Sequence, residues 1–129
     1  MELGLGGSRV LVTGGSKGLG HAIAGELVRE GARVAICARG EEEVLAAGRE
    51  LGVEHAQAAD VTDPDHVQDF VARSAEALGG IDALVNNAGR AHPGTFETLS
   101  DEDWIADLDV KLFSLIRCSR AVLPQRRPG

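Results

Sequence analysis

The sequence lacks the features that mark several large classes of protein. No apolar run approaches the roughly 20 residues of a membrane-spanning helix, so none is predicted. Lysine and arginine number 13 against 20 aspartates and glutamates, a formal net charge of −7, which argues against nucleic acid as a partner because phosphate backbones require clustered basic side chains. The first eight residues have neither the basic start nor the apolar core of a secretion signal. We therefore expect a cytoplasmic protein.

Cysteine and histidine are too sparse to predict a disulfide or a metal centre. Cys37 and Cys118 are the two cysteines, and neither belongs to a Cys-x-x-Cys pair, so we expect reduced, buried thiols. The histidines show no ligand spacing, and no metal site is predicted. These histidines are His21, His55, His66 and His92.

The remaining composition is that of one globular domain. The chain has 129 residues, of which 43% are hydrophobic and 26% charged, so we expect a single domain over residues 1–129. Short apolar runs alternate with helical patterns, which favours an α/β fold with a parallel sheet. The predicted strands cover residues 10–13, 33–38, 55–59 and 81–85. The predicted helices run from Gly18 to about 30, over 41–51, from Pro64 to 78, and from Ser100 to Pro124.

A glycine-rich loop follows the first predicted strand. The stretch from Val10 to Gly20 reads Val-Leu-Val-Thr-Gly-Gly-Ser-Lys-Gly-Leu-Gly. Glycines at 14, 18 and 20 permit a tight turn, a close approach of backbone N–H groups to a ligand, and close packing of helix on strand. A helix that starts near Gly18 adds free N–H groups and the positive end of its dipole. The stretch predicts a site for a pyrophosphate group.

The end of the second strand indicates which dinucleotide binds. In dinucleotide-binding folds an acidic residue about 20 positions beyond the glycines binds the ribose 2′-hydroxyl, whereas an arginine accommodates a 2′-phosphate. Ala38 and Arg39 occupy these positions, and Lys17 brings a second positive charge. This pattern favours NADP(H) over NAD(H). The alternative is that both cations are ordinary surface residues.

The third and fourth predicted strands also end in candidate binding residues. Asp60 and Val61 follow the third strand, at the sheet edge where ligands of doubly wound folds lie; alternatively, the Asp60 carboxylate satisfies N–H groups of its own loop. Asn-Asn-Ala-Gly at 86–89 follows the fourth strand. Its amides can tie neighbouring strands together, and its two small residues leave room for a ribose.

Together, Thr-Gly-x-x-x-Gly-x-Gly from Thr13 and Asn-Asn-Ala-Gly at 86–89 resemble the signatures of the short-chain dehydrogenase/reductase family, and the resemblance extends from about Ser8 to about Pro124. It implies a Rossmann-like doubly wound parallel sheet, here of about four strands in the order 3-2-1-4 with helices on both faces. It also implies a nicotinamide dinucleotide cofactor. The residues assigned to the cofactor are Gly14, Ser16, Lys17, Gly18, Leu19, Gly20, Arg39, Asp60, Val61, Asn87, Ala88 and Gly89, whereas Asn86 is expected to be more structural.

Two departures from the family limit the prediction of catalysis. Lys111 stands where family members usually carry an Asn that supports a proton-relay water; the alternative is an ordinary helix lysine. Family members are about twice as long, and the resemblance places their catalytic Ser and Tyr-x-x-x-Lys beyond position 129. The present sequence contains no tyrosine, and residues 125–129 suggest a polar tail rather than the start of a strand. No catalytic residue is therefore assigned.

The function predicted from these motifs is NADP(H) binding as part of a short-chain dehydrogenase/reductase-like oxidoreductase that acts on an alcohol or ketone. Two alternatives are a non-catalytic nucleotide-binding or interaction module and a truncated, inactive product. The fourth strand lies at an edge of the predicted sheet, and the last helix is apolar on most of its sides. Both features invite a partner, so we expect a homo-oligomer.

Overall fold

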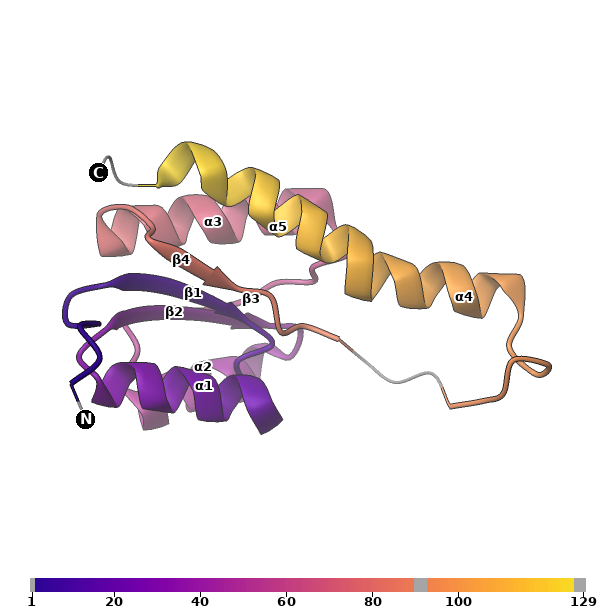
Figure 1. Cartoon of the computed structure of the whole chain (residues 1–129), viewed down its shortest axis with the longest axis horizontal. Helices are drawn as coiled ribbons and strands as arrows, with labels where there is room; N and C mark the ends of the chain where they lie inside the picture. The colour runs from indigo at the N-terminus through magenta and orange to yellow at the C-terminus, as the bar shows by residue number, and fades with distance from the viewer. Residues whose placement is uncertain (1, 90–92, 127–129) are drawn as a thin grey trace.

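The computed structural model describes residues 2–89 and 93–126 and contains a parallel four-stranded sheet (Figure 1). The strands are β1 (Arg9–Thr13), β2 (Arg33–Ala38), β3 (His55–Ala58) and β4 (Ala83–Val85). Their order is β3-β2-β1-β4, and each pair of neighbours is parallel. The predicted topology is confirmed. Because the strands are parallel, all their carboxyl ends meet at one edge of the sheet, where the glycine-rich loop also lies.

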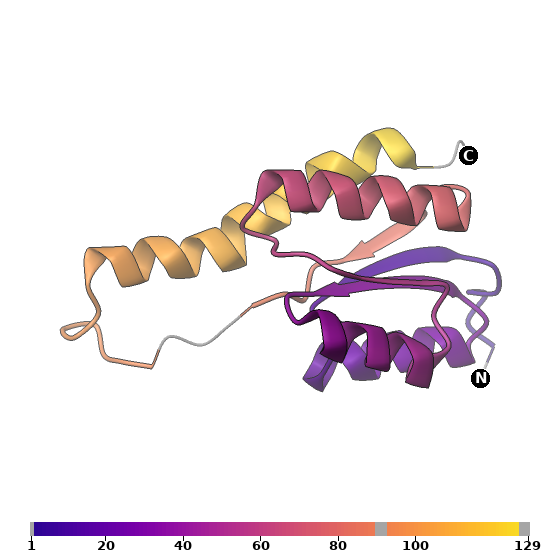
Figure 2. The same ribbon diagram turned by 180° about the vertical axis from the view of Figure 1, so that it is seen from behind.

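Helices cover both faces of the sheet, as predicted (Figures 1 and 2). On one face α1 (Gly18–Arg29) and α2 (Glu41–Leu51) pack over a core that contains Val12 and Ile36. On the other face α3 (Pro64–Leu78) and α5 (Ser114–Val122) pack over a second core, which includes both cysteines. The interiors of the two central strands, β1 and β2, are apolar and buried on both sides because helices cover both faces there.

Local signals in the sequence set most helix boundaries. The Asp63 carboxylate caps α3 by accepting from the N–H groups of Asp65 and His66 at 2.9 and 3.3 Å, and Pro64 follows at the first helical position. Gly52 and Gly79 end α2 and α3 in the left-handed conformation, with φ of 74° and 79°. The sequence alone therefore places these elements accurately.

The last predicted helix is not one regular α-helix. It consists of α4 (Asp101–Leu108), a π-helical turn η1 (Asp109–Phe113), α5, and a 3₁₀ turn η2 (Leu123–Gln125). The predicted stop at Pro124 is wrong by a residue or two, because proline is tolerated in the first turn of the 3₁₀ segment. At the junction with α5 the hydroxyl of Ser114 donates to the Val110 carbonyl of η1 and competes with the regular backbone bond. Figure 2 shows α4 projecting beyond the sheet.

The edge strand β4 is shorter than predicted, and its neighbour is unexpected. Regular pairing covers 83–85 rather than 81–85. Ile81 instead forms an isolated parallel bridge with Arg126, and its N–H donates to the Gln125 carbonyl at 3.1 Å. Gln125 belongs to η2 and Arg126 forms one isolated bridge, so the prediction that this segment does not start a strand is confirmed for these two residues. The bridge itself forms because an edge strand offers unpaired backbone groups whatever the polarity of the side chains. Residues 127–129 lie outside the described residues.

The buried face of α1 consists of small residues. Leu19, the second residue of the helix, is 70% exposed. The buried residues of the helix are Gly20, Ala24 and Gly25. Gly20 lies so close to the backbone of the loop that no side chain fits there, and a Cβ on Gly25 would lie 3.3 Å from the Leu51 side chain of α2.

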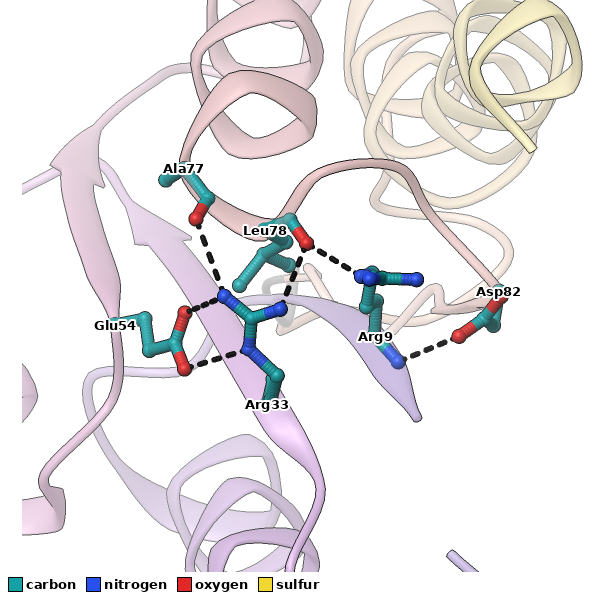
Figure 3. Close-up of polar contacts among 6 residues, drawn as sticks. All are labelled: Arg9, Arg33, Glu54, Ala77, Leu78 and Asp82. Atoms are coloured by element: carbon teal, nitrogen blue, oxygen red, sulfur yellow. Dashed lines mark hydrogen bonds and ion pairs between the residues drawn. The ribbon is translucent and has the colours of Figure 1, made fainter. Parts of the chain in front are cut away.

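Two arginines form polar contacts at the end of the sheet opposite the glycine-rich loop (Figure 3). Arg33 forms a bidentate pair with Glu54, both distances being 2.7 Å, and donates to the carbonyls of Leu78 and Ala77 at 3.0 and 3.4 Å. Arg9 also donates to the Leu78 carbonyl. These contacts satisfy carbonyls left free at the end of α3. The hydrogen bond from Arg33 holds the pKa of Glu54 below its usual range.

Candidate functional site

A pocket of about 320 Å³ opens at the carboxyl ends of the strands. Its walls come from the loop after β1, the end of β2 and start of α2, the loop after β3, the segment after β4, and η1. The residues of the wall are Gly14, Ser16, Lys17, Cys37, Ala38, Arg39, Gly40, Glu43, Ala59, Asp60, Val61, Asn87, Ala88, Gly89 and Val110. This is the edge at which the sequence analysis predicts a dinucleotide.

Glycine is required in the loop at two positions for different reasons. Gly14 has φ of 68°, and a Cβ on it would lie 3.0 Å from the Cα of Ala88. Gly20 has ordinary backbone geometry, but a Cβ there would overlap the Gly14 carbonyl and the Asn87 amide. The loop therefore lies directly against the segment after β4.

Thr13 joins this segment to β1. Its side-chain oxygen accepts from the backbone N–H groups of Asn87 and Ala88, each at 3.0 Å, and its side chain is 2% exposed. The Asn87 amide in turn donates to the Gly14 carbonyl at 3.1 Å. The predicted tie between strands is thus made by Asn87, while Asn86 reaches only the Ser119 hydroxyl, at 3.4 Å. Asn87 combines this structural contact with a place in the pocket wall.

The polar rim of the pocket carries charges of both signs. Lys17 and Arg39 are exposed, and neither forms an ion pair within residues 2–89 and 93–126. The Glu43 carboxylate lines the same pocket. Asp60 accepts from the N–H and the hydroxyl of Thr62 at 2.9 and 2.7 Å, so the loop-satisfying alternative holds while the residue also lines the pocket.

The inner wall of the pocket is apolar and includes one thiol. Ala59, Val61 and Val110 are buried there. Cys37 is 1% exposed, and burial raises the pKa of its thiol to about 12. A thiol with so high a pKa stays protonated at neutral pH and is not a nucleophile. The wall is therefore suited to contact with flat, weakly polar groups and not to covalent chemistry.

Four residues named in the sequence analysis lie outside the wall of the pocket. Gly18 begins α1 with φ of 61°, and Leu19 faces solvent. Gly20 packs against the Gly14 carbonyl and the Asn87 amide. Lys111 lies in η1 with its side chain 55% exposed, and its Nζ pairs with Asp107 at 3.0 Å. The structure thus places Lys111 away from the pocket, whereas the adjacent Val110 lines it.

Residues 8–129 match the short chain dehydrogenase family. The chain belongs to this family. It is 38% identical over 122 residues to a glucose 1-dehydrogenase of Gluconobacter oxydans, covering 91% of this chain and 46% of that protein. It is also 35% identical over 133 residues to a 2,3-dihydro-2,3-dihydroxybenzoate dehydrogenase of Bacillus subtilis, with coverages of 98% and 51%. The chain spans about half the length of these curated relatives.

Solved structures of the family share the fold. A short chain dehydrogenase of Burkholderia cenocepacia, crystallised with NADP, superposes with a TM-score of 0.85 at 41% identity over 95% of this chain and 52% of that one. The L-sorbose reductase of Gluconobacter frateurii, complexed with NADPH and L-sorbose, gives a TM-score of 0.90 at 33% identity, with coverages of 97% and 49%. The chain thus corresponds to about half of each solved family member.

The structure adds pocket residues that the sequence analysis of this short-chain dehydrogenase chain did not assign. Gly40 and Glu43 follow Arg39 closely, so extending the analysis from the strand end into the first turn of α2 would have found them. Cys37 and Ala59 could have been found as the residues just before predicted ones. Val110 could not, because it reaches the pocket through the π-helical turn, which has no clear sequence signal.

The described residues contain neither a metal-binding cluster nor a membrane-spanning helix. Within residues 2–89 and 93–126, no three His, Cys, Asp or Glu side chains lie close enough to hold a metal ion. His92 lies outside the described residues. No helix in the described residues has the length and apolar character needed to cross a bilayer.

Proposed function

We propose that this chain binds NADP(H) and forms the cofactor-binding part of a short-chain dehydrogenase that exchanges hydride with an alcohol or ketone. The observation that carries the proposal is the convergence on one pocket of the glycine-rich loop, two unpaired cations and the segment after β4. An oxidoreductase fold alone would leave the nucleotide unspecified. The residues that line the pocket favour NADP(H) as the nucleotide.

Each wall of the pocket suits a different part of the nucleotide. Backbone N–H groups at the start of α1, beside Gly14 and Ser16, suit the pyrophosphate. Lys17 and Arg39 suit a 2′-phosphate, because arginine offers a planar pair of donors and both side chains are otherwise unpaired. Family members solved with NADP and NADPH support the same assignment.

The remaining walls suit the two ends of the dinucleotide. The adenine would lie against Asp60 and Val61, which combine a carboxylate with an apolar contact. The segment 87–89, held by Thr13, would face the nicotinamide ribose. When bound, the cofactor supplies or accepts hydride. The sequence contains no tyrosine, so a tyrosine proton donor of the kind that the resemblance implies is not among these residues.

Titration of the chain with NADPH and NADH tests the proposal. We expect NADPH to bind more tightly by about 1–3 kcal/mol, because the 2′-phosphate gains charge-assisted hydrogen bonds. Arg39→Asp should reverse the order of the two affinities, since a carboxylate repels the phosphate and accepts from a ribose hydroxyl. Calorimetry or quenching of nicotinamide fluorescence measures both affinities.

Several outcomes would contradict this assignment. Failure of both nucleotides to bind would remove the proposed function, and equal affinities would remove the preference for NADP(H). Steady oxidation of NADPH with a ketone, catalysed by the purified chain, would show that these residues do more than bind cofactor. Glu102→Gln, an exposed change in α4 outside the pocket wall, serves as the control and should leave both affinities unchanged.

We also propose that the chain self-associates through the helical face that leads from α4 to η2. Large apolar side chains on this face are exposed: Trp104 by 42%, Ile105 by 66%, Leu108 by 45%, Leu112 by 46%, Phe113 by 47%, Leu115 by 43%, Ile116 by 36% and Leu123 by 56%. A concentration of exposed apolar side chains in one helical segment favours an interface or an aggregation site. A homo-oligomer would cover it.

Sedimentation velocity at micromolar concentration tests self-association. We expect a dimer or larger species, and Ile105→Glu should shift the distribution towards the monomer by placing a charge in the covered face. Glu50→Gln, an exposed change of charge on α2, which packs on the opposite face of the sheet from α5, should leave the distribution unchanged. A wild-type chain that sediments as a stable monomer would contradict the proposal.

A further inference from the structure

The first turn of α2 carries a negative charge at the place where the proposed function expects an anion. The helix begins at Glu41, and its N-cap, Gly40, supplies no side-chain cap. The first N–H groups of the helix therefore have no side-chain acceptor from the cap residue, and together with the helix dipole they favour an anion. Gly40 itself lines the pocket beside Arg39.

Glu43 lies over this helix end. Its side-chain carboxyl carbon and Oε1 would each be 3.5 Å from a Cβ built on Gly40. Glu43 also lines the pocket, together with Lys17 and Arg39. The carboxylate thus covers the start of the helix on the pocket side, next to the two cations that suit a 2′-phosphate.

We infer that Glu43 sets the strength of the cofactor preference by acting as an internal competitor of the 2′-phosphate. Like charges in one rim repel each other, and the phosphate carries close to two negative charges at neutral pH. The carboxylate also occupies the helix end that could otherwise bind the phosphate. NADH lacks this phosphate, so Glu43 lowers the affinity for NADPH selectively. The inference rests on the proposed function, because it concerns the same pocket.

The first turn of α2 provides its own matched control. Glu41, Glu42 and Glu43 are all exposed acidic residues of this turn, and each contributes one negative charge near the helix start. Glu43 alone of the three lines the pocket. Glu42→Gln and Glu43→Gln therefore make the same change in net charge and nearly the same change in the helix-dipole interaction, but only the second alters the pocket wall.

The test measures NADPH and NADH affinities for the wild-type chain and for both glutamine variants at low ionic strength. Glu43→Gln should lower the dissociation constant of NADPH about five- to tenfold, as expected for charges about 4 Å apart on an exposed rim where water of high dielectric constant surrounds them. It should change that of NADH by less than about twofold. Added salt should shrink the gain, because exposed charges are screened.

The remaining outcomes separate this inference from the proposed function. If the wild-type chain binds both nucleotides but Glu43→Gln strengthens them equally or not at all, the role of Glu43 is overturned and the proposed function stands. An equal gain with Glu42→Gln also overturns it, because a general charge effect would then suffice. If neither nucleotide binds any of the proteins, both the role of Glu43 and the proposed function fail.

Discussion

Gly20→Ala is expected to lower the free energy of unfolding by more than about 3 kcal/mol, enough to unfold a marginally stable domain. The added Cβ would overlap the carbonyl oxygen of Gly14 and Nδ2 of Asn87, and would lie 2.8 Å from the Gly14 carbonyl carbon. Two of these atoms are backbone, so the strain cannot be relieved by rotating a side chain. The loop, the start of α1 and the segment after β4 would have to separate.

Urea denaturation followed by circular dichroism measures this loss by linear extrapolation. Gly89→Ala is the control, because a Cβ at Gly89 meets no atom of residues 2–89 and 93–126 within 4 Å and its backbone is not left-handed. It should change the free energy of unfolding by less than about 1 kcal/mol. A Gly20→Ala variant as stable as Gly89→Ala would show that the loop does not pack as described.

The parallel sheet can be predicted from the sequence because the signals for its strands and helices are local and recur along the chain. Val10 and its neighbours in β1 are apolar without alternation, as in a strand covered on both faces, and Gly52 and Gly79 end their helices where the pattern requires. The capping box of Ser100 and Asp103 likewise forms as its spacing suggests. Elements of this kind are encoded by residues near to each other in the chain.

The unpredicted features depend on contacts between distant residues. The bridge between Ile81 and Arg126 forms because the fourth strand lies at a free edge of the sheet. The polar side chains of the tail give no sign that its backbone pairs with this edge. The π-helical turn brings Val110 to the pocket through a backbone irregularity. Glu43 is a different case, because its fold-back over Gly40 is local and extending the sequence analysis into the first turn of α2 would have named both residues.

Thr13 shows how such a distant contact supports the candidate site. In sequence it is the last residue of a buried strand, typical in its β-branching. In the structure its oxygen is the acceptor for two backbone N–H groups more than seventy positions away, at Asn87 and Ala88. The site-forming segment after β4 is held at its start by this one buried side chain and by the Asn87 amide.

Thr13→Val is therefore expected to lower the free energy of unfolding by about 2–4 kcal/mol, since two half-buried N–H groups lose their acceptor at nearly constant volume. Thr13→Ser keeps the oxygen and loses only a methyl group, so it should cost about 1 kcal/mol. Urea denaturation of both variants compares these losses, and NADPH titration should show weaker binding by Thr13→Val than by Thr13→Ser. Equal losses of stability in the two variants would mean that packing of the methyl group, and not the pair of hydrogen bonds, holds the segment after β4 against β1.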